Sequence, residues 1–145
     1  MNNAALPKTA IPSIGISVRS SYGRMTDPRT GAQQVIDRAA AAEASKLDSL
    51  FLGDHHATLT PYYQNIPMMG RLLGNWSGST CGVLVLLPLW HPVLVAEMLS
   101  TLASITSSRF VLQAGIGYGK KQFSALSADY ERRGERFEQA LNILK

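Results

Sequence analysis

The sequence predicts an α/β fold in which short parallel strands alternate with helices. Three observations lead to this prediction: four short apolar runs of the kind that form buried strands, helical spacings of apolar residues between them, and loops rich in glycine, proline and serine. The chain has 145 residues, of which 46% are apolar and 17% charged, and this suits a globular domain with a sizeable core. We therefore expect repeated βα units on one parallel sheet.

The strands and helices can be assigned along the chain. Strands are expected over residues 14–18, 50–53, 83–87 and 110–114, and helices over residues 32–46 and 65–73, from Pro92 onward and near the end of the chain. In the first helix Val35, Ala39 and Ala42 recur at spacings of four and three, so one face can pack against the sheet. The His91-Pro92 step fits a helix start, because proline at the first helical position loses no needed hydrogen bond.

The number of units leaves three architectures open. An eight-stranded (β/α) barrel takes about 250 residues, so four units do not close one. The chain could be a fragment of a barrel, a half-barrel that needs a partner, or a smaller doubly wound sheet of the flavodoxin type, which the length alone favours. The flavodoxin-like sheet would have the first strand in its centre, whereas a half-barrel would have it beside the second strand only.

Charge and hydropathy exclude several classes of partner. The formal net charge of +4 comes from 14 Lys and Arg scattered among 10 acidic residues, without the dense basic run that marks a nucleic-acid surface. No apolar stretch approaches the roughly 18 residues that span a bilayer, and residues 1–13 lack the features of a secretory signal. We expect a soluble cytoplasmic protein that binds neither nucleic acid nor membrane. Its single cysteine, Cys81, is expected to be a small buried residue.

Polar residues directly after the apolar runs are the first candidates for a site, because parallel sheets bind ligands at the carboxyl ends of their strands. Such residues occupy positions 19–21, 54–56, 89–91 and 115–118. In Asp54-His55-His56, two imidazoles beside a carboxylate provide a base near neutral pH and a group that can orient it or contact a cofactor. Helix capping or exposure to solvent explains the same residues equally well. A metal site is not favoured, because no third ligand has matching spacing.

Glycines follow the fourth strand at positions 115, 117 and 119. They allow the backbone to approach a ligand closely, and a nucleotide phosphate is the usual one. The dinucleotide-binding pattern would need a further glycine at position 120, where Lys120 stands, and we expect no helix to begin promptly after this loop. A tight turn without a phosphate remains the alternative. Trp76 and Trp90 flank the third strand and either border a pocket or pack in the core.

Several segments, in one order over nearly the whole chain, together resemble a known family. They are the Ala-rich residues 39–45 leading into 47–51, Asp54-His55-His56, residues 83–88, His91-Pro92-Val93-Leu94, Thr101-Leu102, Arg109-Phe110, Gly115-Ile116-Gly117 and residues 133–144. This ordered set resembles the luciferase-like monooxygenase superfamily, which includes bacterial luciferase, FMN-dependent monooxygenases and coenzyme F420-dependent oxidoreductases.

The resemblance implies a fold and a function. Residues 1–145 would form one partial domain, the N-terminal half of a (β/α)8 TIM-like barrel, which overrides the length argument for a flavodoxin-like sheet. The parent enzyme would be a flavin-dependent oxidoreductase or monooxygenase that uses FMN with oxygen, or coenzyme F420, on a small organic substrate. A homo-oligomer or completion by the missing barrel half is expected. The alternative is a non-catalytic half-barrel fragment that needs a partner chain.

The resemblance also assigns residues. It implies that His55 is the catalytic acid or base, and that the cofactor contacts are Asp54, His56, Val83, Leu84, Gly115, Gly117 and Tyr118. The Val83-Leu84 step matches a point where family members often have a bulge with a non-proline cis peptide behind the flavin ring. Gln122 stands where many relatives carry glutamate, and Tyr118 stands where some F420 dehydrogenases carry a catalytic glutamate. These departures argue against an F420 sugar-phosphate dehydrogenase mechanism.

Overall fold

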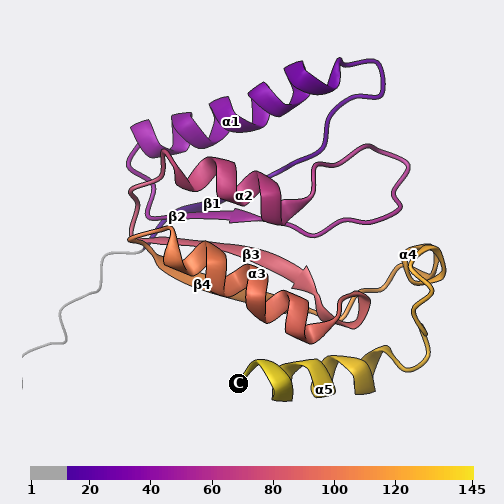
Figure 1. Ribbon diagram of the computed structural model, residues 1–145. Helices are drawn as coiled ribbons and strands as arrows, with labels where there is room; N and C mark the ends of the chain where they lie inside the picture. Colours follow the sequence, from indigo (N-terminus) through magenta and orange to yellow (C-terminus); the bar gives the residue numbers. More distant parts are fainter. Residues whose placement is uncertain (1–12) are drawn as a thin grey trace, which may run out of the picture.

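The computed structural model describes residues 13–145, and its strands form one parallel four-stranded sheet in the order β1-β2-β3-β4 (Figure 1). The strands are β1 (Gly15–Val18), β2 (Ser49–Leu52), β3 (Thr80–Leu86) and β4 (Arg109–Gly115). The helices are α1 (Pro28–Ala44), α2 (Asn65–Leu73), α3 (Pro92–Ser104), α4 (Lys120–Ala125), α5 (Arg133–Leu144) and the short 3-10 helix η1 (Leu87–Leu89). Because β1 lies at an edge beside β2 only, the flavodoxin-like alternative is wrong and the half-barrel order is confirmed.

Helix α1 begins four residues earlier than the apolar spacing predicted. The Asp27 carboxylate accepts a hydrogen bond from the Thr30 backbone N–H at 2.8 Å, and Pro28 occupies the first helical position. Both features are typical of a helix start, since the first turn has unpaired N–H groups and no use for a proline N–H. The helix ends at Ala44, and Lys46 after it has a positive φ of 56°.

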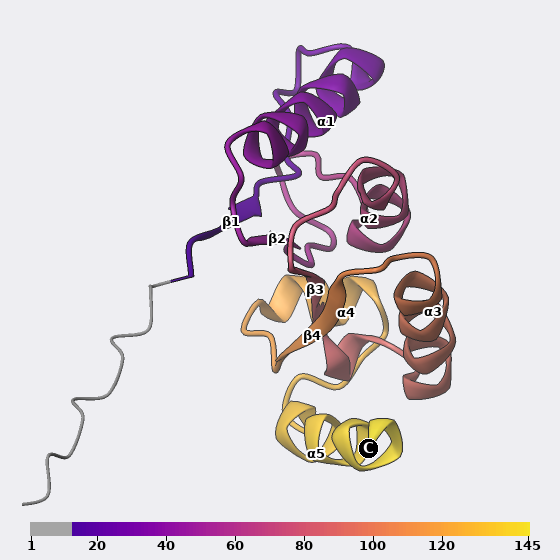
Figure 2. The same ribbon diagram turned by 90° about the vertical axis from the view of Figure 1, so that its left-hand side faces the viewer.

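Helices α1, α2 and α3 lie side by side against one face of the sheet, and α5 packs against η1 and α3 (Figure 2). Alternate strand residues point toward these helices, as the period of two in a strand requires. The fully buried strand side chains on this face are Leu50, Leu52, Cys81, Val83 and Val85. Cys81 is therefore the buried residue that the sequence predicted, and burial raises the pKa of its thiol.

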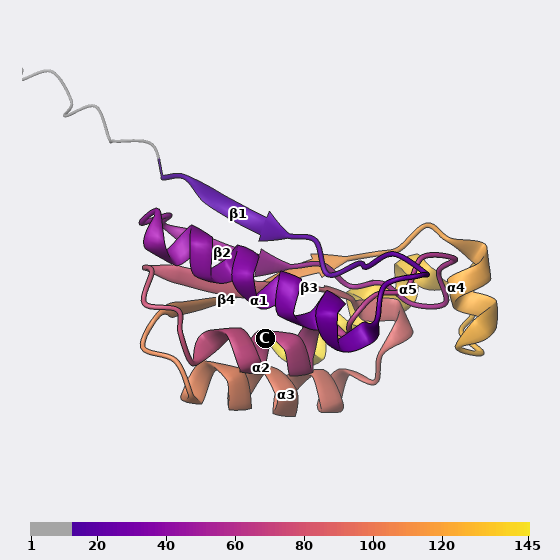
Figure 3. The same ribbon diagram turned by 90° about the horizontal axis from the view of Figure 1, so that it is seen from above.

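The opposite face of the sheet carries Phe51, Gly82, Leu84 and Leu86, which alternate with the helix-facing residues. No helix of residues 13–145 packs on this face, which corresponds to the interior of a closed barrel. The four strands run in the same direction, so the loops that follow them gather at one end of the sheet, with α4 beyond it (Figure 3). Any site of the kind expected for parallel sheets therefore lies at that end.

Two further sequence-based expectations are wrong. The described residues contain no cis peptide bond, so the Val83-Leu84 step is trans. Strand β3 stays in unbroken parallel register with β4 from Thr80 to Leu86, and a regular ladder has no bulge that would compensate the about 3–4 kcal/mol cost of a cis bond. The other error concerns the glycine loop, because α4 begins at Lys120, directly after Gly119. This helix has only 6 residues.

Within the part of the chain that the structure describes, no helix combines the length and apolar character needed to cross a membrane. The expectation that the amino terminus lacks a secretory signal concerns residues 1–13, and all but the last of these lie outside the described residues. Trp76 is a core residue, which is one of the two roles that the sequence left open for it. Its indole N–H donates to the Thr80 carbonyl at 3.1 Å.

Candidate active site

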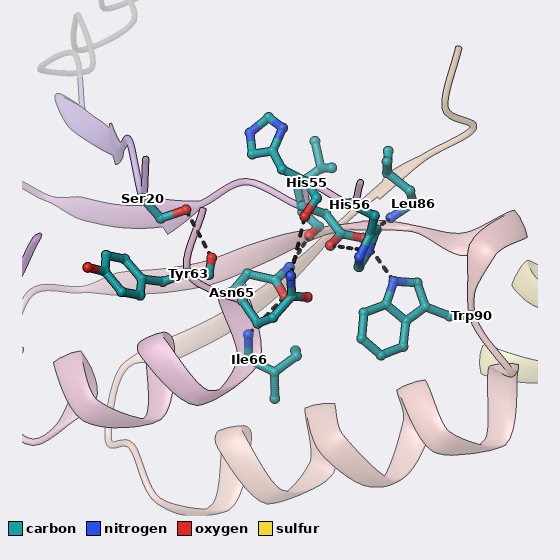
Figure 4. Close-up of polar contacts among 11 residues, drawn as sticks. Ser20, His55, His56, Tyr63, Asn65, Ile66, Leu86 and Trp90 are labelled. Atoms are coloured by element: carbon teal, nitrogen blue, oxygen red, sulfur yellow. Dashed lines mark hydrogen bonds and ion pairs between the residues drawn. The ribbon is translucent and has the colours of Figure 1, made fainter. Parts of the chain in front are cut away.

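The loops that follow β1 and β2 are joined at the carboxyl end of the sheet. Ser21 and Tyr62 form an antiparallel bridge. Next to it, the Tyr63 N–H donates to the Ser20 carbonyl at 3.0 Å, and the buried Ser20 hydroxyl donates to the Tyr63 carbonyl at 3.2 Å (Figure 4). These bonds fix the far end of the loop that carries Asp54, His55 and His56.

Asp54 is a buried carboxylate held by donors from another part of the chain. Its Oδ2 accepts from the Leu86 backbone N–H at 2.8 Å and from the Trp90 indole N–H at 2.9 Å (Figure 4). His56 Nε2 lies 2.8 Å from Oδ1, but the ring N–H is not directed at that oxygen, so neither atom has a directed hydrogen bond among the described residues. The Asp54 side chain has no exposed area. It therefore acts on the site through its neighbours.

The two histidines point to different sides of the loop (Figure 4). The His56 ring meets Trp90 edge-on, with ring centroids 5.4 Å apart. The His55 ring instead packs on Tyr62, with centroids 4.1 Å apart, and its Nε2 lies 3.1 Å from where a Cβ on Gly53 would stand. Gly53 thus leaves room for His55 at the end of β2.

His55 has the electrostatic surroundings of a neutral imidazole. Partial burial is the main cause that lowers its pKa from the usual 6.5, and the nearby Arg19 and His56 lower it further, while Asp54 opposes them. Within residues 13–145 neither ring nitrogen of His55 has a hydrogen-bond partner. Since a neutral imidazole with a free nitrogen can accept a proton near pH 7, His55 is chemically suited to acid-base work.

Strand β3 extends beyond β2, and side chains take over the pairing there. The β2 ladder ends where Leu52 lies opposite Val83, whereas the β4 ladder continues to Leu86. On the free side, the Leu84 carbonyl accepts from the Asn65 side-chain amide at 2.6 Å, and the Leu86 N–H donates to Asp54. Asn65 is a site residue that the sequence did not predict. The available signal was a polar residue at the start of a helix that has no other polar residue before Arg71.

The glycine loop after β4 is a tight turn closed by α4. Gly117 has a φ of 75°, and a Cβ there would lie 3.1 Å from the buried Phe123 ring of α4. A side chain at Gly115 would meet Leu86 on the neighbouring strand. Next to these glycines, Ile116 and Tyr118 are 45% and 91% exposed. The loop thus presents apolar side chains at the mouth of the sheet, and its glycines are explained by packing.

The structure brings only some of the predicted site residues together. Asp54 and His56 form one cluster with Trp90, and His55 lies beside them on the other side of the loop. Val83 is fully buried on the helix side, whereas Leu84 faces the open side of the sheet. Gly115 is the last residue of β4, and Gly117 and Tyr118 lie in the loop after it. A Cβ at either glycine would meet side chains of β3 or α4.

The model of the luciferase-like monooxygenase family matches residues 13–145. The chain belongs to this family. Its four parallel strands with alternating helices therefore form part of the family's (β/α) barrel, as the resemblance predicted. An F420-dependent glucose-6-phosphate dehydrogenase of Microbacterium testaceum is 27% identical to this luciferase-like chain over 132 residues, which cover 85% of the chain and 38% of the relative.

Two solved structures resemble the luciferase-like chain in fold. The oxygenating constituent of 3,6-diketocamphane monooxygenase from Pseudomonas putida, a type II Baeyer-Villiger monooxygenase in complex with FMN, has a TM-score of 0.77 at 17% identity, with 92% of this chain and 39% of that chain covered. EDTA monooxygenase from Chelativorans sp. BNC1 has a TM-score of 0.76 at 18% identity, with 91% and 37% covered. The luciferase-like chain thus spans less than half the length of each relative.

Proposed function

We propose that this chain supplies the N-terminal half of the active site of an oxidoreductase that uses FMN or coenzyme F420 on a small organic substrate. In this proposal His55 moves the proton. The observation that carries it is a half-buried imidazole with a lowered pKa and a free ring nitrogen, at the carboxyl end of β2. Family membership supports the proposal, because relatives include an F420-dependent dehydrogenase and an FMN-bound monooxygenase.

The residues at the mouth fit a flavin or deazaflavin ring. Such a ring needs an apolar surface for its face and polar groups at its edge. Leu84 on the open face and the exposed side chains of Ile116 and Tyr118 supply apolar surface, and His55 supplies a polar group. When bound, the cofactor would supply the redox chemistry, and this chain would position it and move a proton. Leu84, Gly115, Gly117 and Tyr118 are the proposed cofactor contacts, with Val83 contributing only backbone.

Asp54 and His56 act indirectly in this proposal. Because the Asp54 side chain is buried and bonded to Leu86 and Trp90, it holds the end of β3 against the loop that carries His55. His56 contacts both Asp54 and Trp90 and so helps to hold the same loop. Their contribution is to keep His55 in place and to exclude water from the carboxylate.

Titration of the intact protein that carries this chain with FMN and with F420, each in both redox states, tests the cofactor. Quenching of fluorescence reports binding of either cofactor. Formation of an oxygenated product from the substrate, in the presence of reduced FMN and oxygen, would assign a monooxygenase, whereas substrate-dependent reduction of F420 would assign a dehydrogenase. A protein that binds neither cofactor would contradict the proposal. The departures at Tyr118 and Gln122 lead us to expect no activity on glucose 6-phosphate.

A second candidate is a half-barrel that functions only when another chain completes it. The observation that favours it is the open architecture, in which β1 and β4 are both edge strands and one sheet face has no covering helix among residues 13–145. Exposed edges and apolar faces promote association with another chain. Light scattering of residues 1–145 alone distinguishes the cases: this candidate predicts an oligomer, and a clean monomer would exclude it.

A further inference from the structure

Two side chains form hydrogen bonds with the free edge of β3 at the proposed cofactor site. Beyond Val83 the strand has no β2 partner, although it continues in register with β4 as far as Leu86. The Leu84 carbonyl is nevertheless paired with the Asn65 side-chain amide, and the Leu86 N–H with the Asp54 carboxylate. Two side chains thus supply hydrogen bonds to β3 beyond the point where β2 has ended.

Asn65 is suited to this position by having a donor and an acceptor on one short side chain. It is 1% exposed. Its amide nitrogen donates to the Leu84 carbonyl at 2.6 Å, and its amide oxygen accepts from the Ile66 N–H at 2.8 Å, in the first turn of α2 (Figure 4). Aspartate would keep only the acceptor when ionised, and leucine would keep neither.

The position of Asn65 in the chain couples two walls of the site. One wall is Leu84, whose side chain faces the open side of the sheet. The other is the loop of residues 53–64, which carries His55 and runs directly into Asn65. At the other end of that loop, Asp54 is bonded to Leu86. Both ends of the His55 loop are therefore bonded to one short stretch of β3, at Leu84 and at Leu86.

We infer that Asn65 is a positioning residue of this site: together with Asp54 it holds the His55 loop and residues 84–86 of β3 in the arrangement that receives the cofactor ring. The inference rests on the proposed function for its consequence, but the fastening of the β3 edge can be measured without any cofactor. Asn65 touches neither the reacting atoms nor the ring in this account, and it acts through Leu84 and the loop.

Asn65→Asp tests the inference, because it removes the donor to Leu84 and keeps the acceptor for Ile66. The introduced carboxyl would face the Leu84 carbonyl, so burial and that oxygen would raise its pKa. Once protonated, it can donate to Leu84 again. We expect the variant to bind FMN at least tenfold more weakly than wild type at pH 8, with the ratio shrinking toward one near pH 5. Asn142→Asp, on the exposed surface of α5, is the matched control and should show no such trend.

Amide hydrogen exchange supplies the readout that needs no cofactor. At pH 8 the Leu86 N–H should exchange at least tenfold faster in Asn65→Asp than in wild type, relative to core amides such as that of Leu50. Global destabilisation alone would speed both amides together and leave the FMN affinity ratio independent of pH, and that result would overturn the inference. If wild type binds neither FMN nor F420, the proposed function fails, while the exchange of Leu86 still decides whether Asn65 holds the strand.

Discussion

Replacement of Trp90 by phenylalanine is predicted to destabilise the protein mainly by removing a donor from a buried carboxylate. Asp54 Oδ2 has two directed donors, Leu86 N–H and the Trp90 indole N–H at 2.9 Å, and the side chain has no exposed area. A hydrogen bond to a charged group contributes roughly 1.5–3 kcal/mol, against about 1 kcal/mol for a neutral pair. We therefore expect Trp90→Phe to lower the free energy of unfolding by about 2 kcal/mol.

The effect of losing the hydrogen bond can be separated from the effect of the changed packing by a double-mutant cycle with Asp54→Asn, measured by urea unfolding. With a urea m-value of about 2 kcal/mol/M, the single variant should unfold at a midpoint about 1 M lower. In the Asp54→Asn background the same replacement breaks only a neutral bond, so its cost should fall to about 1 kcal/mol, a coupling of about 1 kcal/mol. The cavity left by the smaller ring is common to both measurements and cancels. Additive losses would refute the charged hydrogen bond.

Two further predictions concern other parts of the fold. Gly117→Ala should destabilise the protein by roughly 1–2 kcal/mol in urea unfolding, because φ is 75° and the new Cβ would press on Phe123. At Gly134 the new Cβ would have no neighbouring atom within 4 Å, so Gly134→Ala should stabilise α5 by about 0.5–1 kcal/mol. Equal effects of the two replacements would contradict the requirement for glycine in the turn. The hydrogen bonds from Ser77 lower the pKa of Glu43, so its stabilising contribution is present above pH 4.5 and is lost as the pH falls through the lowered value. Glu43→Gln should remove this acid-dependent part of the unfolding free energy, and an unchanged pH profile would contradict it.

The fold was largely predictable because its signals are local. Apolar spacing and the His91-Pro92 step placed α3 at Pro92, and the ordered motifs identified a barrel half. The start of α1 was misplaced because the Asp27-Pro28 cap lies in a stretch that looks like loop when only apolar spacing is followed. The helix after Gly119 was missed for a similar reason, since α4 is short and has one buried apolar residue, Phe123.

The site was predictable in location and less so in arrangement. The motif Asp54-His55-His56 lies at the carboxyl end of β2 as expected, but nothing local says that the two imidazoles diverge. The bond between Asp54 and Trp90 joins residues that are 36 positions apart, so it depends on how β2 and β3 pair. The hydrogen bond of Asn65 to β3 depends likewise on β3 extending beyond the end of β2. Residue patterns do not determine this difference in strand length.

The alternation of strand residues also predicts which side chains can reach the same ligand. Adjacent residues on a strand point to opposite faces, so Val83 and Leu84 could not both present side chains to one cofactor. The structure has Val83 in the helix-side core and Leu84 on the open side. The cis bond expected between them came from the resemblance alone, and the unbroken register with β4 leaves no place for it.

The pH dependence of turnover in His55→Gln tests the proton-transfer role most directly. Because burial lowers the pKa of His55 below 6.5, wild-type kcat/KM should be constant above that pH and fall as the pH drops through the lowered value, where the imidazole becomes protonated. His91→Gln, at an exposed position, is the control. In the intact protein with its cofactor bound, His55→Gln should lower kcat by more than tenfold and abolish the acid limb while cofactor affinity is largely kept. Wild-type rates with the acid limb intact would contradict the account.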